Sequence, residues 1–396
     1  MNKNLIWYGP PYSYSGYATH NRCMLFELHK LNWNIRLIPT ESYIPTELIG
    51  ATLLQKFVNN KNINPQESIC INLIPPPTLP YWGKYTILFT TLESETVHEG
   101  YMRRCLQFDE VWVPCKSNLL SMKKAGYPKH KLHYCPEGVY SQFWKPTTHK
   151  LKQYESSDFT FFYNGDWSYR KGVDILIPAF AKAFSPTDNV RLLLLTHYQG
   201  HGKETSLQHI GTEFQEICQK HNITRTPRIQ FIYEHIPDPL MPKLFNCADI
   251  GVFPTRGEAW GLPIIQLMSC GKPVITTNWG GQLDYCNKHN SYLIDIEKFD
   301  ILDDKVHLTV DFYKQQKFAF PSENHLISLM KYCYNHPDLV KARGQKARQD
   351  MERNFQWKES GQIANKRLMY LLMKKNNNQS VWTSDQATYE DQATYV

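Results

Sequence analysis

The feature that most constrains this chain is a rhythm of apolar, β-leaning stretches that alternate with helical stretches, and it runs twice along the sequence. Strands that alternate with helices predict parallel sheets covered by helices on both faces. The expected fold class is therefore α/β, with two doubly wound domains whose ligands bind beyond the carboxyl ends of the strands, in the cleft between the domains. The stretches in the first half are NLIWYG, a helical segment from about 17 to 31, WNIRLIP, YTILFTTLE and EVWVP; those in the second are FTFFYNGDW, helical VDILIPAFAKAF, VRLLLLTHY and IQFIYEHI.

The division between the two runs indicates the domain limits. A length of 396 residues suffices for two domains with separate cores. The run KLHYCPEGVYSQFWKP ends the first half, and the polar TTHKLKQYESSD is typical of a linker. We expect one domain over 1–150, a second over 151–356, a helix over 357–374, and a tail over 375–396 whose repeated DQATY indicates disorder.

One short stretch, RGEAWGLPIIQLMSCGKPVITT at 256–277, combines a carboxylate with the start of a helix. Pro263 suits the first turn of a helix, Gly271 suits the position just past its end, and PVITT predicts a buried strand. A helix N-terminus carries roughly half a positive charge and favours anions, phosphate above all. Glu258 could simply cap this helix, a common role for an acid in this place. Capping explains neither Gln266 nor the glycines of NWGG after the strand.

Composition indicates an intracellular protein. The ten cysteines form no CxxC pair and no Cys/His cluster with metal-ligand spacing, which predicts reduced thiols in a cytosolic protein. No apolar run approaches the roughly 20 residues that span a bilayer. The N-terminus passes directly into a strand pattern, without the apolar region of a signal peptide. We expect a cytoplasmic protein, or one that touches a membrane only from outside.

The net charge of +7 is mild, and its densest part is residues 103–131. SNLLSMKKAGY in this segment predicts a basic amphipathic helix, which suits peripheral contact with anionic lipid. A solvated helix face is the favoured alternative. The basic residues are not interleaved with stacking aromatics in a repeated motif, so we expect no nucleic-acid partner.

Several strand-end loops together resemble the family of GT-B-type retaining glycosyltransferases, glycosyltransferase family 4-like and described as glycosyl transferases group 1. The resemblance covers roughly residues 4 to 372 in the expected order. It implies two Rossmann-like domains that face each other across a cleft, an acceptor domain first and a nucleotide-sugar donor domain second, with the last helix crossing back to the first domain. The segments are GPPYSYSGYATHNR, TTLESETV, FDEVWVPCKSN, HYCPEGVYSQFWKP, FYNGDWSYRKGVDILIPAFAKAF, FNCADIGVFPTRGEAWGLPIIQLMSCGKPVITTNWGGQLDY and HPDLVKARGQKARQDMERNFQW.

The resemblance implies that two cations in NGDWSYRKG hold the donor diphosphate. Arg170 would bind it as a fork and Lys171 as a point charge. A pair of surface cations at the base of an amphipathic helix is the alternative. This sequence departs from the family at Asp166, which stands after Gly165, near the place where relatives commonly have an arginine. Arg170 is expected to substitute for it.

The remaining site residues are also implied by the resemblance. The first acid, Glu258, would bind hydroxyls of the donor sugar, and the position of Gln266, usually a glutamate, would hold the nucleotide ribose. Glu93 is a candidate for contact with the acceptor or the sugar, and Gly16 lies in the loop used near the donor phosphate and acceptor, with a plain turn as its alternative. The catalytic set expected is Glu258, Lys171, Arg170 and Glu93, and the donor-binding set is Gly16, Gly165, Arg170, Lys171, Glu234, Glu258, Trp260, Gly261, Leu262 and Gln266.

The function expected is transfer of a hexosyl-type sugar, with retention, from a UDP- or GDP-sugar to a hydroxyl of a glycan, a lipid or a protein-linked glycan. No cofactor and no metal are expected, because no D-x-D pair stands at a strand end and Asp295-Ile-Glu297 is poorly placed for one. A catalytically silent nucleotide-sugar or glycan-binding protein on the same fold is the alternative, motivated by Gln266 and the missing arginine. An oxidoreductase is disfavoured, since no G-x-G-x-x-G follows the first strand.

Overall fold

The computed structural model describes residues 3–42, 48–75, 78–198, 203–302 and 311–376. Two parallel sheets of six strands, one in each half of the chain, confirm the predicted α/β architecture. The first sheet has the order β2-β1-β3-β4-β5-β6 and the second the order β12-β11-β10-β7-β8-β9. Read from β9, the second order is 3-2-1-4-5-6, as in a Rossmann fold. Most of the predicted tail over 375–396 lies outside the described residues.

The strands of both sheets are apolar along most of their length because helices cover both faces. All five residues of β3 and all four of β10 are buried. The strands of the first sheet are β1 (Asn4–Gly9), β2 (Asn34–Pro39), β3 (Ile69–Leu73), β4 (Tyr85–Phe89), β5 (Glu110–Val113) and β6 (Leu132–Tyr134); those of the second are β7 (Phe159–Asn164), β8 (Val190–Leu195), β9 (Arg228–Ile232), β10 (Ile250–Phe253), β11 (Val274–Thr277) and β12 (Tyr292–Ile294).

The helices follow the strands in the alternation that the sequence predicts. The expected helix at 17–31 is α1, and the predicted turn after PIIQLMS is present, with Gly271 at a φ of +77°. The helices are α1 (Gly16–Lys30), α2 (Ala51–Asn59), α3 (Glu99–Cys105), α4 (Lys116–Lys124), α5 (Val173–Ala183), α6 (Lys203–Lys220), α7 (Met241–Phe245), α8 (Leu262–Ser269), α9 (Glu323–Asn335), α10 (Pro337–Asn354) and α11 (Trp357–Asn376).

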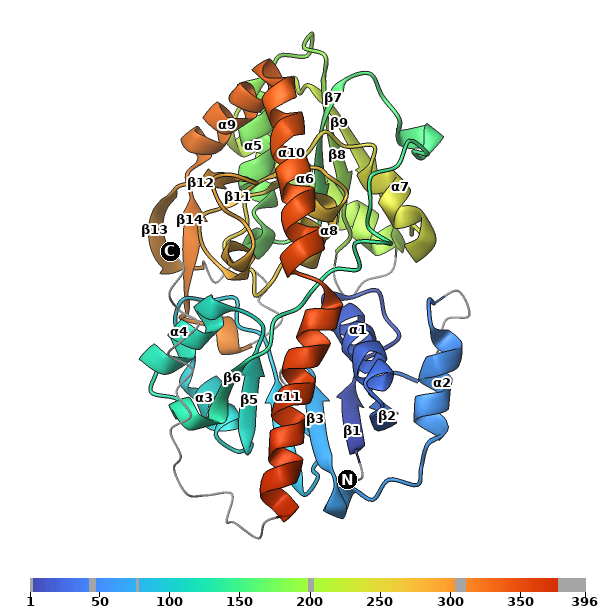
Figure 1. Cartoon of the computed structure of the whole chain (residues 1–396). Coiled ribbons are helices and arrows are strands. Elements are labelled where there is room, and N and C mark those ends of the chain that lie inside the picture. Colours follow the sequence, from blue (N-terminus) through green and yellow to red (C-terminus); the bar gives the residue numbers. More distant parts are fainter. Residues whose placement is uncertain (1–2, 43–47, 76–77, 199–202, 303–310, 377–396) are drawn as a thin grey trace.

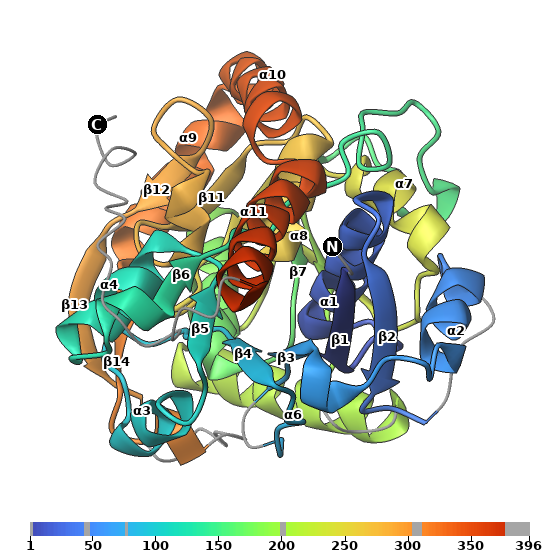
Figure 2. The same ribbon diagram turned by 60° about the horizontal axis from the view of Figure 1, so that its bottom comes forward.

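The last helix, α11, lies against the first half of the chain, next to α1 (Figures 1 and 2). The indole Nε1 of Trp33 donates to Asn365 Oδ1 at 2.9 Å, and Arg367 binds the buried carboxylate of Glu110. The chain therefore ends its described part on the half in which it began. The exact limits of the domains stay a prediction.

A two-stranded antiparallel hairpin stands apart from both sheets and was not predicted. Its strands are β13 (Ile296–Ile301) and β14 (Lys317–Pro321), and the short helix η7 (Asp311–Tyr313) precedes β14. The hairpin belongs to the second half by sequence. Figure 1 shows β14 reaching from the second half toward α4 of the first.

Candidate active site

The candidate site lies where the strand order of the second sheet reverses, between β7 and β10, at the place where ligands bind in open α/β sheets. The loop after β7 ends in the short helix η4 (Tyr169–Lys171), and the loop after β10 leads to α8. Between η4 and α5 stands Gly172, with a φ of +77°. A Cβ there would lie 2.0 Å from the carbonyl oxygen of Pro254, so only glycine permits this approach of the two loops.

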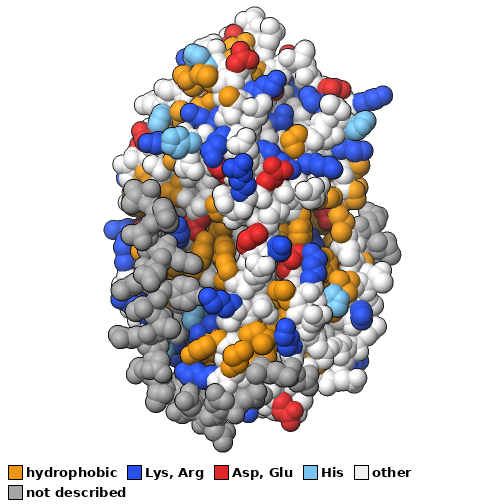
Figure 3. Space-filling model, in the orientation of Figure 1, with side chains coloured by type: hydrophobic (Ala, Val, Ile, Leu, Met, Phe, Trp, Pro, Cys, Tyr) orange, Lys and Arg blue, Asp and Glu red, His pale blue; other side chains and the backbone are white. Residues whose placement is uncertain are grey.

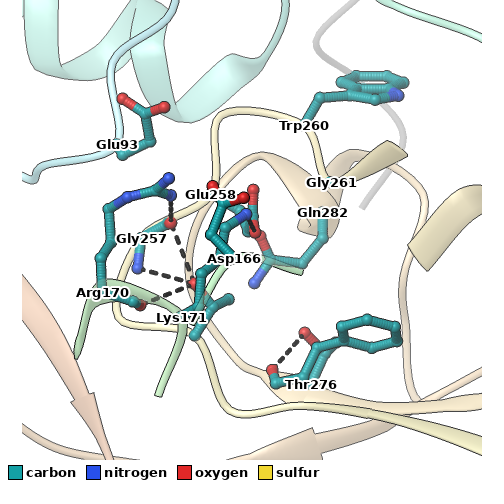
Figure 4. A network of polar contacts seen from close by, with 12 residues as sticks. Glu93, Asp166, Arg170, Lys171, Gly257, Glu258, Trp260, Gly261, Thr276 and Gln282 are labelled. Atoms are coloured by element: carbon teal, nitrogen blue, oxygen red, sulfur yellow. Dashed lines mark hydrogen bonds and ion pairs between the residues drawn. The ribbon is translucent and has the colours of Figure 1, made fainter. Parts of the chain in front are cut away.

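Backbone and side-chain hydrogen bonds join the two loops. The Arg256 amide donates to the Arg170 carbonyl at 2.7 Å, and the Thr255 hydroxyl donates to the same oxygen at 3.1 Å. The guanidinium of Arg170 donates in return to the Gly257 carbonyl at 2.7 Å. The cations of one loop are thereby fixed beside the acid of the other (Figure 4).

Lys171 and Glu258 form an ion pair at the centre of the site. Their side chains are 16% and 12% exposed, so water screens the pair only partly. The helix α8 has no side-chain cap, and the interpretation of Glu258 as a plain helix cap is therefore wrong. A half-buried ion pair can exchange partners, because an anion that approached Lys171 would compete with Glu258 for it.

The start of α8 lies beside this pair. Gly261 has a φ of +89° and precedes Leu262, the first residue of the helix, so backbone N–H groups there are available to an anion. Gln266 is half-buried on the same helix, and its side chain has no hydrogen-bond partner within the described part of the chain. The indole of Trp260 packs on Tyr285 with ring centroids 5.2 Å apart, and Figure 4 shows it turned away from the ion pair.

Arg170 faces acids from both halves of the chain. Burial alone would lower the pKa of its guanidinium, but nearby negative charges, that of Glu93 first, outweigh burial and raise it. Figure 4 shows the guanidinium directed toward Glu93, which belongs to the first half of the chain. The two predicted halves of the site therefore come together around Arg170.

Asp166 also lies in the site, near the place where the resemblance implies an arginine. It accepts a hydrogen bond from His197, whose Nε2 atom is 3.0 Å from Asp166 Oδ1. Burial alone would raise the pKa of Asp166, but the bond from His197 and the charge of Lys171 lower it, so the carboxyl is ionised. With Glu93 and Glu258, Asp166 gives the site three acids against the two cations Arg170 and Lys171.

Three expected residues lie at the margin of this cluster. Glu234 is exposed and accepts hydrogen bonds from Tyr154 and, at 3.1 Å, from Gln153, both on the linker. A Cβ added at Gly16, the first residue of α1, would meet no atom within 4 Å, so it borders open space. A Cβ at Gly165 would meet the Tyr163 hydroxyl at 3.1 Å. Contacts of these residues with a donor stay predictions.

Residues of the hairpin contribute to the site although the sequence analysis did not identify them. The hydroxyl of Tyr313 donates a hydrogen bond to Glu93 Oε2. The only sequence signal was the alternation in IEKFDI and KFAFP, which suits half-buried strands. No local sequence pattern indicates that the hairpin and Tyr313 contact the first half of the chain.

Metal ligation has no structural support within the described residues, which contain no group of three or more His, Cys, Asp or Glu side chains arranged to hold an ion. Asp295 starts the hairpin and pairs with His325 at 3.0 Å. The ten cysteines are all unpaired thiols. No helix in the described part of the chain is long and apolar enough to cross a membrane.

The sequence comparisons match parts of the chain. Residues 158–307 match the model of the family described as Glycosyl transferases group 1. A D-inositol 3-phosphate glycosyltransferase of Segniliparus rotundus is 30% identical over 111 residues, which are 28% of this chain and 23% of that protein. The capsular polysaccharide biosynthesis glycosyltransferase CapM of Staphylococcus aureus is 28% identical over 159 residues, or 40% and 37% of the two chains. The matched segments thus span well under half of these relatives.

Solved structures resemble the whole chain. Anabaena HepE in complex with UDP and glucose has a TM-score of 0.63 at 14% identity and covers 93% of this chain and 100% of its own. Sucrose-phosphate synthase of Thermosynechococcus elongatus has a TM-score of 0.67 at 15% identity and covers 94% and 99%. These similarities establish the GT-B fold predicted from the sequence.

Proposed function

We propose that this chain, which belongs to the family Glycosyl transferases group 1 through its residues 158–307, transfers a hexosyl-type sugar from a UDP- or GDP-sugar to an acceptor hydroxyl with retention of configuration. The observation that carries the proposal is the Lys171–Glu258 ion pair at the point of strand-order reversal, beside the start of α8. This pair supports the proposal because a cation, which suits phosphates, and a carboxylate, which suits sugar hydroxyls, are in contact within one site.

The proposed chemistry depends on charge and position. Lys171, Arg170 and the N-terminus of α8 stabilise the negative charge that develops on the leaving diphosphate. Glu258 and Glu93 accept hydrogen bonds from hydroxyl groups and so orient the reactants. In the same-face mechanism the leaving phosphate oxygen takes the acceptor proton while the acceptor oxygen forms the new glycosidic bond. No protein nucleophile is required.

The first experiment identifies the donor. Thermal shift is measured with UDP, GDP, UDP-glucose, UDP-N-acetylglucosamine and GDP-mannose, because ligand at about 100 times its dissociation constant adds roughly 2.7 kcal/mol to the free energy of unfolding. UDP and UDP-glucose are the first probes, since Anabaena HepE is in complex with UDP and glucose in one structure and with UDP-glucose in another. NMR of the product anomer then tests retention, and an inverted anomer would contradict that part of the proposal.

A silent binding protein is the second candidate, and Asp166 favours it because a carboxylate in place of an arginine weakens attraction for a diphosphate. Release of nucleotide from a nucleotide sugar separates the two. The enzyme releases UDP or GDP with time, whereas a silent protein binds nucleotide and releases none. We also propose that transfer proceeds without a divalent metal; activity lost with EDTA and restored by Mg²⁺ or Mn²⁺ would overturn this.

The proposal extends to a glycan or lipid-linked acceptor and to peripheral membrane contact through residues 103–131. On α4 the exposed Leu120, 59% exposed, lies between exposed Lys116, Lys123 and Lys124. Figure 3 shows Lys and Arg side chains spread over both halves of the face it draws rather than gathered in one band, so the proposal includes no nucleic acid. Sedimentation with phosphatidylcholine vesicles, with and without phosphatidylglycerol, tests it. Binding should need the anionic lipid and fall in Lys123→Ala/Lys124→Ala but not in Lys341→Ala on α10; equal binding by both variants would contradict it.

A further inference from the structure

The hairpin of β13 and β14, with η7, contacts both the first half of the chain and the loop of the second half that carries Glu258. We call its described residues, 296–302 and 311–321, the cross-domain arm. On the first half of the chain, the Glu95 amide donates to the Lys317 carbonyl at 2.7 Å, and the Lys317 amide donates to the Thr96 hydroxyl at 2.9 Å. These two bonds tie the start of β14 to the loop that follows β4.

The cross-domain arm also contacts the first half through aromatic rings. Phe312 packs with the rings of Tyr101 and His98, at centroid distances of 5.6 and 5.8 Å. Tyr101 belongs to the buried cluster between β4, β5, α3 and α4. Because Phe312 inserts among these residues, the adjacent Tyr313 is held in one place.

The same strand contacts the loop that carries Glu258. The Ala319 amide donates to the Arg256 carbonyl at 3.1 Å. A Cβ added at Gly257 would lie 2.1 Å from the Glu93 carbonyl oxygen and 3.1 Å from the Phe318 ring. The loop that carries Glu93, the loop that carries Glu258 and the strand β14 therefore pack directly on one another. Gly257, in the loop with Glu258, lies between Glu93 and Phe318 of β14.

Within this packing, Tyr313 occupies one oxygen of the Glu93 carboxylate. Its hydroxyl donates to Oε2. Burial, and then the charge of Glu93, raise the pKa of the phenol well above its usual value, so it stays protonated and remains a donor. The other oxygen, Oε1, has no hydrogen-bond partner among the residues that the structure describes. Glu93 also interacts with the positive charge of Arg170. Without the hydrogen bond from Tyr313, this attraction would draw the Glu93 carboxylate toward Arg170.

We propose that Tyr313 is a positioning residue, which holds Glu93 so that its Oε1 atom accepts a hydrogen bond from a sugar hydroxyl in the cleft. This inference rests on the proposed function. The hydroxyl belongs either to the sugar of the donor or to the acceptor, and the chemistry of recognition is the same for both. The second half of the chain, through Tyr313 of the cross-domain arm, thereby orients Glu93 of the first half.

The test compares wild type with Tyr313→Phe, which removes the donated hydrogen bond and keeps the ring. The substrate is whichever of UDP-glucose, UDP-N-acetylglucosamine and GDP-mannose the wild type cleaves fastest, with nucleotide release into water as the assay. Calorimetry gives the Kd of the free nucleotide, which should be unchanged. If Glu93 binds the donor sugar, KM for the nucleotide sugar rises about tenfold. If it orients the attacking group, which is water in this assay and takes the place of the acceptor hydroxyl, kcat falls about tenfold. Either change corresponds to the loss of a hydrogen bond to a charged group.

A matched control is Tyr140→Phe, which also removes a phenol hydroxyl that donates to a carboxylate, in this case Glu27 Oε1 at 2.8 Å, outside the residues assigned to the site. It loses the same kind of hydrogen bond as Tyr313→Phe and should leave kcat and KM within about twofold. A double variant, Tyr313→Phe/Glu93→Gln, should be no slower than Glu93→Gln alone, because both changes act through one carboxylate.

Two results would overturn the inference. One is a Tyr313→Phe enzyme with unaltered kcat and KM; the other is additive effects of Tyr313→Phe and Glu93→Gln. Both leave the proposed function intact. A wild type that binds UDP or GDP and cleaves no nucleotide sugar would instead remove the proposed function, and this inference with it.

Discussion

At the scale of single residues, the site depends on which charges face one another. Lys171 is paired with Glu258, and Asp166 with His197. That Arg170, on η4, substitutes for the arginine expected after the strand glycine stays a prediction. A diphosphate would have to compete with three carboxylates for two cations, so each cation should contribute strongly to turnover.

Replacement of either member of the central pair should reduce turnover. We expect Lys171→Ala and Glu258→Ala to lower kcat/KM at least about tenfold, or roughly 1.4 kcal/mol, since in the proposed function each removes a group that contacts the donor. Steady-state kinetics with the preferred nucleotide sugar measures the effect. Lys182→Ala is the control, because Lys182 lies on α5 and, among the residues that the structure describes, pairs only with Glu323, at 2.7 Å. Near-normal turnover in both site variants, with the fold intact, would refute these site assignments.

Gln266 offers a second residue-scale test. A carboxylate at this position would bind a ribose hydroxyl more tightly than an amide, since hydrogen bonds to charged groups contribute about 1.5–3 kcal/mol against about 1 for neutral ones. We expect Gln266→Glu to lower the donor KM severalfold with little change in kcat, as uniform binding requires. If Gln266→Glu created activity in an inert wild type, the silent-binder candidate would be correct. If neither Gln266→Glu nor Gln266→Ala changed donor affinity, the residue would be a helix-surface amide.

At the scale of elements, glycines determine how closely the loops of the site approach. Gly257 and Gly281 both lie so close to carbonyl oxygens that a Cβ would clash with them. A Cβ at Gly281 would lie 1.9 Å from the Ala259 carbonyl oxygen. The Gly281 amide donates to the Glu258 carbonyl at 2.7 Å, so the loop after β11 supports the loop that carries the acid. The NWGG motif is therefore a support for Glu258.

Enlarging Gly257 should separate the two sides of the cleft. Gly257→Ala places a methyl group against the Glu93 carbonyl and the Phe318 ring, so we expect a loss of about 1–3 kcal/mol in the free energy of unfolding and a fall in turnover. Gly211→Ala is the matched control, because a Cβ at that position of α6 meets nothing within 4 Å and helix propensity favours alanine by up to about 1 kcal/mol. Urea titration measures both. Equal stability of the two variants would contradict the close approach.

The elements that the sequence predicted are those with local signals. The run NLIWYG is a strand with the expected limits, the strand within FTFFYNGDW ends earlier than expected, at Asn164, and the proline and glycine around α8 define its ends. The loops with Lys171 and Glu258 were identified through the family resemblance, and they lie together because both follow strands at the carboxyl edge of one sheet. The contact of Tyr313 with Glu93 joins residues 220 positions apart through a hairpin with no counterpart in the βαβ rhythm, so no local pattern indicated it.

At the scale of the whole molecule, the two halves meet at a second place besides the arm. The carboxylate of Asp284, in the short helix η6 (Gly281–Asp284), accepts hydrogen bonds from the Tyr134 hydroxyl at 2.8 Å and from the Lys116 amide at the start of α4 at 3.2 Å. Burial raises the pKa of Asp284 from 3.8 to about 6, despite these bonds. Ionisation of this group therefore opposes the docking of η6 on α4.

This contact predicts a dependence of stability on pH. The folded state binds the proton of Asp284 more tightly than the unfolded state. The stabilisation that protonated Asp284 gives to the folded state is therefore complete below pH 3.8 and is lost as the pH rises to about 6. We expect Asp284→Asn, which stays neutral, to be more stable than wild type by about 1–3 kcal/mol above pH 6 and to lose that advantage below pH 4. Urea unfolding of both proteins between pH 4 and pH 8 measures the difference. A constant difference over this range would show that the carboxyl does not titrate there.

The position of α11 has a consequence for biosynthesis. Glu110 is 1% exposed, and burial lowers the pKa of the neighbouring His133 to about 4, so Arg367 supplies the permanent countercharge. Arg367 follows Glu110 by 257 residues, which at 5–20 residues per second is a delay of roughly 13 to 50 s on the ribosome. During that interval the nascent first half has an unneutralised acid and an uncovered α1. It should therefore stay open to chaperones until the end of α11 has left the exit tunnel, so that the half made first is completed last.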